Sequence, residues 1–76
     1  MVELVRYIAR SLVEKPDAVD VREVENADSI VVELRVDPDD MGKVIGKQGR
    51  IAKAIRTVVR AASVRENKKY VVEIIG

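Results

Sequence analysis

The chain has 76 residues, 47% of them hydrophobic, and a formal net charge of +1. This length suits a single domain, residues 1–76, with one core. The absence of cysteine and histidine excludes disulfides, thiolate metal sites and the commonest general base, so we expect no cofactor, no small-molecule substrate and no enzyme activity. Regularly spaced charges in the first 15 residues are unlike a signal peptide or membrane span and predict a cytoplasmic protein without a membrane partner.

The charges are unevenly distributed along the chain. All 13 acidic residues lie outside residues 41–65, and this window contains seven basic residues: Lys43, Lys47, Arg50, Lys53, Arg56, Arg60 and Arg65. Such a segment concentrates positive potential where an anion can bind, while the acidic remainder limits unspecific attraction to polyanions.

The first half of the chain predicts one helix and two strands. Apolar residues at helical spacing predict a helix over residues 2–13, which ends before Pro16 because proline disfavours helical angles in the preceding residue. Apolar and polar residues alternate at the start of residues 18–26, and the alternation then shifts by one position, which predicts a short strand at a sheet edge. A polar turn follows. Residues 30–36 alternate cleanly, with one face formed by Ile30, Val32, Leu34 and Val36.

A helix start follows this strand. Asp37 suits the N-cap position, Pro38 the first helical position, and Asp39 and Asp40 the first turn, where they face the positive end of the helix dipole. We expect this helix to run to Ile45. The three acids also allow a divalent-ion site, but the helix start explains them without a metal.

A second helix is predicted from Arg50. Its apolar residues cover about half of the circumference, more than one packed face requires, so part of this surface is expected to contact a second chain. The charged residues Arg56, Arg60 and Arg65 are interpreted as solvated. Residues 63–69 predict a polar turn, and residues 69–75 predict a strand that is apolar on both faces, as a central strand would be.

The order of these elements predicts an α+β fold, α-β-β-α-α-β, with three helices on one face of a three-stranded sheet. Two glycines interrupt what otherwise resembles one long helix. We expect Gly46 to take a positive φ angle and so end the first helix, and Gly49, which lacks a Cβ, to allow close approach to the main chain. The N–H groups of the following helix, together with Lys47, Arg50 and Lys53, would then attract a phosphate.

The stretch VIGKQGRIAKAI, residues 44–55, resembles the signature of the KH domain, in which a GxxG loop between two helices holds single-stranded nucleic acid. The element order resembles the type II KH fold, which has a mixed sheet, and the size is similar to the small single-domain KH proteins of bacteria, the KhpA type. This resemblance implies single-stranded RNA as partner, a homodimer, and a heterodimer with a larger KH-bearing protein. It also assigns the loop residues Gly46, Lys47, Gln48 and Gly49 to the RNA backbone.

The resemblance further implies that Val44, Ile45 and Ile51 wall the cleft or anchor its helices. The bases would lie between that wall and the strand over residues 30–36. With Lys43, Arg50 and Lys53 assisting the loop, the leading hypothesis is an RNA chaperone or post-transcriptional regulator. Its alternatives are a protein-assembly adaptor, a binder of single-stranded DNA, and a plain turn without a ligand. The two tyrosines, Tyr7 and Tyr70, form no aromatic base-stacking series.

Overall fold

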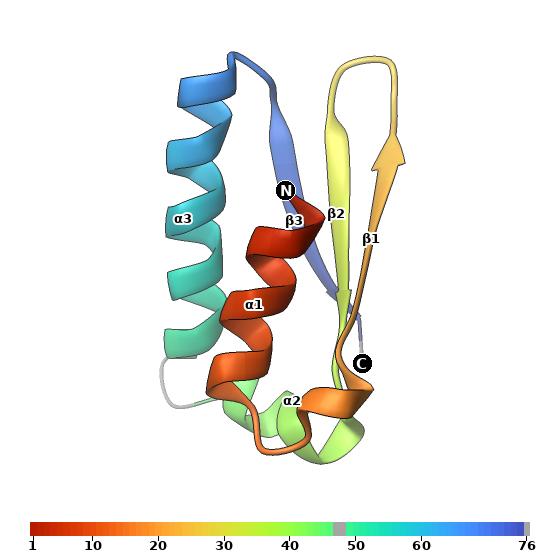
Figure 1. Ribbon diagram of the computed structural model, residues 1–76, viewed down its shortest axis with the longest axis vertical. Coiled ribbons are helices and arrows are strands. Elements are labelled where there is room, and N and C mark those ends of the chain that lie inside the picture. Colours follow the sequence, from red (N-terminus) through yellow and green to blue (C-terminus); the bar gives the residue numbers. More distant parts are fainter. Residues whose placement is uncertain (47–48, 76) are drawn as a thin grey trace.

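The computed structural model describes residues 1–46 and 49–75. Helices cover one face of a three-stranded mixed sheet, in the predicted order of a type II KH-like α+β fold (Figure 1). The elements are α1 (Val2–Leu12), η1 (Pro16–Ala18), β1 (Asp20–Glu25), β2 (Ile30–Arg35), α2 (Pro38–Ile45), α3 (Arg50–Glu66) and β3 (Tyr70–Ile75). No helix within these described ranges has the length and apolar character needed to cross a bilayer.

The sheet has the strand order β1-β2-β3, with β1 antiparallel and β3 parallel to β2. The prediction of β1 as an edge strand is confirmed, whereas the prediction that residues 69–75 form the central strand is wrong. The apolar second face of β3 has another explanation, because Val71 lies in register with Val31 and, across β2, with Val24. These three valines form a row on the face of the sheet that carries no helix, and Val71 is 43% exposed.

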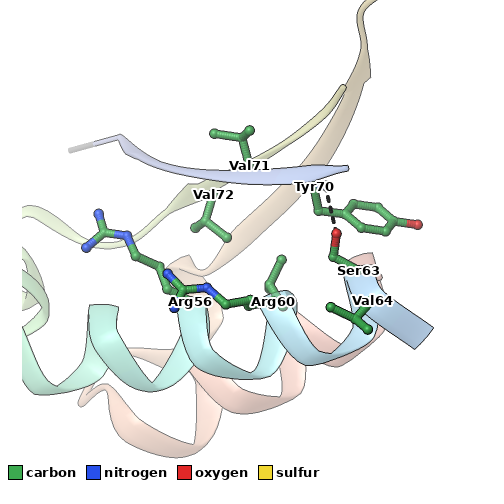
Figure 2. Close-up of a pocket in the computed structure, with 8 residues that line it drawn as sticks. Arg56, Arg60, Ser63, Val64, Tyr70, Val71 and Val72 are labelled. Atoms are coloured by element: carbon green, nitrogen blue, oxygen red, sulfur yellow. Dashed lines mark hydrogen bonds between the residues drawn. The ribbon is translucent and has the colours of Figure 1, made fainter. Parts of the chain in front are cut away.

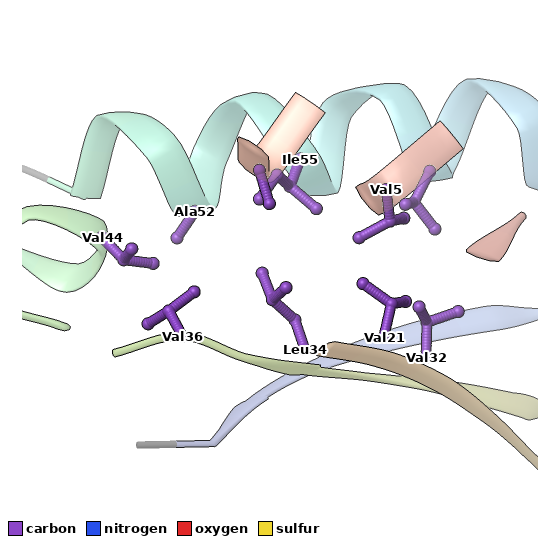
Figure 3. Packing of buried hydrophobic residues seen from close by; sticks show 10 residues of the cluster. Val5, Val21, Val32, Leu34, Val36, Val44, Ala52 and Ile55 are labelled. Atoms are coloured by element: carbon purple, nitrogen blue, oxygen red, sulfur yellow. The ribbon is translucent and has the colours of Figure 1, made fainter. Parts of the chain in front are cut away.

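The core lies between the sheet and the helices (Figure 3). The helix-facing side of β2 is buried, as its alternation predicted, and α3 contributes every third or fourth residue. The buried apolar side chains are Val5, Ala9, Val21, Val32, Leu34, Val36, Val44, Ala52, Ile55 and Val59. This packing fixes α3 lengthwise beside β3, which is the arrangement on which the functional site depends.

Helix α3 is longer than the sequence predicts. The residues from Ser63 to Glu66 continue the helix and do not form the expected turn. The helix ends at Asn67, which has a left-handed conformation with φ of 54° and donates its N–H to the carbonyls of Ser63 and Val64. Asparagine tolerates this conformation better than most residues, so the stop signal is Asn67 itself and not the polarity of the segment.

The start of α2 agrees with the predicted cap. The Asp37 carboxylate accepts a hydrogen bond from the N–H of Asp39 at 2.9 Å, and Pro38 occupies the first turn. Asp40 also lies in this turn, but its side chain is buried and bonds to main-chain N–H groups of Glu14 and Lys15. Its predicted role beside the helix dipole is therefore incomplete, since a contact between distant segments was invisible in the local sequence.

Lys15 joins the segment after α1 to the start of α2. Its ammonium group donates to the Asp39 carboxylate and lies 3.7 Å from that of Asp37. The hydrogen bond from Lys15, followed by its charge, lowers the pKa of Asp39. In return, the bond to Asp39 and the charge of Asp37 raise the pKa of Lys15. The contact is thus strongest when both groups are charged.

We expect Lys15→Gln to lower the melting temperature in a pH-dependent way. A lowered Asp39 pKa stabilises the fold above its ordinary value of 3.8, and this contribution is lost as the pH falls through the lowered value. A raised Lys15 pKa stabilises the fold at pH values below its ordinary value of 10.5, and this contribution is lost as the pH rises through the raised value. Melting curves should show a difference from the unsubstituted chain at neutral pH that disappears in acid, while Lys68→Gln serves as an exposed control. A difference of equal size in acid would contradict this assignment.

Candidate functional site

A tight turn connects α2 to α3 and contains both glycines. The N–H of Gly46 donates to the Gly42 carbonyl at 2.7 Å, and the N–H of Gly49 donates to the Gly46 carbonyl at 2.8 Å. Gly46 is extended, with φ of −79°, whereas Gly49 is left-handed, with φ of 63°. The prediction of a positive φ at Gly46 is therefore wrong, because the chain reverses only as it enters α3. Lys47 and Gln48 lie outside the described residues.

Each glycine is required for a different physical reason. A Cβ on Gly46 would lie 2.0 Å from the Gly42 carbonyl oxygen. The close approach expected at Gly49 is therefore found at Gly46, and the group that approaches is the main chain of the preceding helix. A Cβ on Gly49 would meet nothing within 4 Å, but its left-handed conformation disfavours other residues. The main chain at Gly49 is consequently open to a ligand.

The first turn of α3 starts at this open glycine. Gly49 is the N-cap residue and provides no side-chain acceptor, so the first N–H groups of α3 have no partner within the helix. These groups and the helix dipole favour an anion. Arg50 and Lys53, both exposed, add positive charge within the first turn. The elements of the predicted phosphate site in the described residues therefore lie together.

Exposed cations continue along α3 beyond its first turn. Arg56 and Arg60 are exposed, and within the described ranges neither they nor Arg50 and Lys53 form an ion pair. Lys43 differs, because its ammonium group pairs with the Glu14 carboxylate. Of the predicted basic site residues, those on α3 are therefore available to an anion, whereas Lys43 is already engaged.

A groove of about 280 Å³ lies between α3 and the edge strand β3. Figure 2 shows Val72 pointing from β3 toward α3, with Val71 pointing away. The N–H of Tyr70 donates to the Ser63 hydroxyl at 3.4 Å and joins the two elements at one end. The groove is lined by Arg56, Val59, Arg60, Ser63, Val64, Tyr70, Val71 and Val72. It is thus apolar between strand and helix, and cationic along the helix.

Two sequence-based interpretations can be compared with the residues that line this groove. The strand over residues 30–36, which was expected to face the bases, does not line the groove, because β2 is central and its helix-facing side chains Val32 and Leu34 are fully buried. The strand that lines the groove is β3. Arg56 and Arg60 are exposed, as their interpretation as solvated residues requires, and both also line the groove. Their spacing of four residues is the signal that could have identified them, since it places them on one side of α3.

Tyr70 is a further groove residue that the sequence did not single out. Its hydroxyl donates to the Glu66 carboxylate at 3.1 Å. Burial, followed by this hydrogen bond and the charge of Glu66, raises the pKa of Tyr70. The phenol therefore stays neutral to a higher pH than that of a free tyrosine.

The three predicted apolar site residues have different environments. Val44 is fully buried and anchors α2 in the core. Ile51 is half-buried against the same core. Ile45, directly before Gly46, is 59% exposed. Of the three, Ile45 is therefore the one most accessible to a ligand beside the turn.

Comparison with known proteins identifies the family. Residues 2–74 match the family described as "KhpA/KhpB, KH domain". The chain belongs to this family. A protein of Clostridium perfringens named "RNA-binding protein KhpA" is 69% identical over 75 residues, covering 99% of this chain and 100% of the relative. Relatives of the same name from Caldanaerobacter subterraneus and Aquifex aeolicus are 61% and 48% identical, over 99% and 96% of this chain and 100% and 92% of their own lengths.

Membership of the KhpA/KhpB family confirms the resemblance of the chain to small bacterial KH-domain proteins, and with it the expectation of a non-enzymatic chain. No solved structure gave a significant match. The assignment therefore depends on full-length sequence similarity together with the observed order of elements.

The two glycines can be distinguished by alanine substitution. Gly49→Ala should lower the free energy of unfolding by about 1–2 kcal/mol, because alanine resists the left-handed conformation. Gly46→Ala should also destabilise the fold, because its methyl group would overlap the Gly42 carbonyl. Gly42→Ala is the control, since its Cβ meets nothing within 4 Å inside α2 and should stabilise by about 0.5–1 kcal/mol. Urea unfolding curves in which Gly49→Ala is as stable as Gly42→Ala would contradict the geometry.

Proposed function

We propose that this chain binds single-stranded RNA, with the sugar-phosphate backbone at the turn between Gly46 and Gly49 and the bases in the groove between α3 and β3. The observation that carries the proposal is the line of exposed cations that starts at the open turn and follows α3 beside the groove. The relatives named as RNA-binding proteins, which match almost the whole chain, support the same function.

The contact with the backbone is argued from the main chain at the turn. Gly49 leaves space for a phosphate to approach, and the first N–H groups of α3 follow it directly in the chain. Arg50 and Lys53 neutralise the phosphate charge, and Lys47 and Gln48 complete the loop in sequence. Contacts of this kind fix the position of the RNA strand but do not distinguish one base from another.

The groove supplies the contact with the bases. Val72, which is half-buried, provides apolar surface for base faces, and Ser63 offers a hydrogen-bonding group beside it. Arg56 and Arg60, exposed on the helix side of the groove, pair with the phosphates that follow along α3. A groove between a helix and a strand edge admits bases that are unpaired and turned away from their backbone, which favours single strands over duplexes. The mechanism requires no aromatic platform, although Tyr70 lies at the groove end.

Contacts to the backbone at the turn are common to every RNA sequence. We therefore propose a broad role, as an RNA chaperone or post-transcriptional regulator, and a domain that comprises the whole chain. The homodimer, the heterodimer with a larger KH-bearing protein and the cytoplasmic location stay predictions. Val64, which is 80% exposed near the end of α3, is the large apolar side chain of this helix left available to a second chain, and sedimentation at micromolar concentration would test the dimer.

The loop is tested by Lys47→Asp with Gln48→Asp. This double variant should weaken RNA binding by about ten-fold or more, since it replaces attraction of the phosphates by repulsion. Fluorescence anisotropy of a labelled single-stranded RNA measures the affinity. Arg10→Asp with Ser11→Asp makes the same change of charge on the exposed side of α1 and should bind nearly normally. Unchanged binding by the loop variant at an unchanged melting temperature would reject the loop mechanism and favour a protein-assembly adaptor.

The groove is tested by Arg56→Gln with Arg60→Gln. Three or four phosphate contacts predict a slope of about −2 to −3 for log K against log salt concentration, and loss of both arginines should reduce its magnitude by about 1 to 1.5. Arg6→Gln with Arg10→Gln removes the same charge from α1 and should leave the slope nearly unchanged. Equal slopes for the two double variants would contradict the groove assignment.

Equal affinity for RNA and DNA of one sequence would instead indicate a general binder of single strands.

A further inference from the structure

Helix α2 leads directly into the Gly46–Gly49 turn but is itself a weak element. It has only eight residues, and a helix of two turns is not stable alone in water. Val44 is its one fully buried apolar side chain among the described residues, with Met41 packed partly against the core. Other contacts must therefore hold α2 in its orientation, and with it the start of the turn.

Asp40 provides the most specific of these contacts. Its side chain is 1% exposed and is the only charged or polar side chain buried in the described part of the chain. One carboxylate oxygen accepts the N–H of Glu14 at 3.1 Å and the other accepts the N–H of Lys15 at 3.0 Å. Both amides belong to the segment that follows α1, more than 20 positions earlier in the sequence. We call this pair of hydrogen bonds the Asp40 contact.

Two exposed interactions surround the Asp40 contact and run between the same segments. The Glu14 carboxylate pairs with the ammonium group of Lys43, and the Lys15 ammonium group bonds to Asp39. Exposed ion pairs contribute little stability on their own. Buried hydrogen bonds to a charged carboxylate are stronger, and the loss of an acceptor leaves main-chain donors unsatisfied. The Asp40 contact is therefore the decisive one of the three.

We propose that Asp40 is a positioning residue for RNA binding: by holding α2 to the segment after α1, it keeps the Gly46–Gly49 turn in the geometry that receives the phosphate backbone. This inference rests on the proposed function. Asp40 is buried and touches no part of the groove, so it acts through α2 and not through contact with the ligand. Its loss lets α2 sample other orientations, and each RNA-binding event must then restore the correct one.

The test compares Asp40→Asn with Val5→Ala. Asparagine keeps the size of Asp40 but presents an amide N–H₂ group to one of the two main-chain donors. Val5 is fully buried in α1 and lies far along the core from Val44 (Figure 3), so its truncation destabilises the fold without touching α2. Both variants are measured at a temperature where circular dichroism shows them fully folded.

Two readouts separate a positioning role from a general loss of stability. Asp40→Asn should weaken binding of a labelled single-stranded RNA by about five-fold relative to Val5→Ala, and hydrogen exchange should accelerate selectively at the amides of α2 and at Glu14 and Lys15. Equal RNA affinity of the two variants, or uniform acceleration of exchange across the chain, would overturn the proposal. If Asp40→Asn does not fold, Asp40→Glu, which retains a carboxylate, replaces it with the same two readouts.

The result for the unsubstituted chain distinguishes this proposal from the proposed function. Failure of the unsubstituted chain to bind the RNA would overturn both, although the exchange data would still show whether Asp40 orders α2. Normal binding by the unsubstituted chain and by Asp40→Asn would overturn only the positioning role.

Discussion

The hydrogen bond from the Gly49 N–H to the Gly46 carbonyl closes a turn so short that neither glycine can be replaced without strain. Because α2 ends and α3 begins within this turn, the first N–H groups of α3 emerge beside main chain that carries no Cβ. The remaining features of the site follow from the direction in which α3 leaves the turn. Its buried side packs on the sheet, and its exposed cations accompany β3 along the groove.

The separation of charge gives this geometry its chemical character. The basic segment over residues 41–65 contributes to α2 and α3. Most of the acids lie before it, from α1 to the first turn of α2, and only Glu66 and Glu73 follow it. Several acids are paired with cations from their own neighbourhood, as Lys15 is with Asp39 and Lys43 with Glu14. The cations of α3 beside the groove have no such partner among the described residues, so their field is directed outward toward an anionic ligand.

Local signals predicted most of the fold, and the features that they missed depend on contacts between distant segments. The alternation of β2, the Asp37 cap and the start of α3 at Arg50 depend on neighbouring residues and were confirmed. The edge position of β3 could not be predicted, because its apolar outer face packs in a row with Val24 and Val31 of other strands. The burial of Asp40 and the position of Arg56 beside the groove also depend on tertiary packing. The left-handed conformation was predicted for Gly46 but occurs at Gly49, because the sequence does not reveal at which residue the turn reverses.

A titration of the chain with single-stranded RNA, followed by backbone amide NMR, tests the central claim most directly. The account predicts that the largest shift changes fall at the turn around Gly49, on the groove side of α3 and at the start of β3. Changes confined to the exposed side of α1 or to the helix-free face of the sheet would contradict it, as would the absence of any change at saturating RNA.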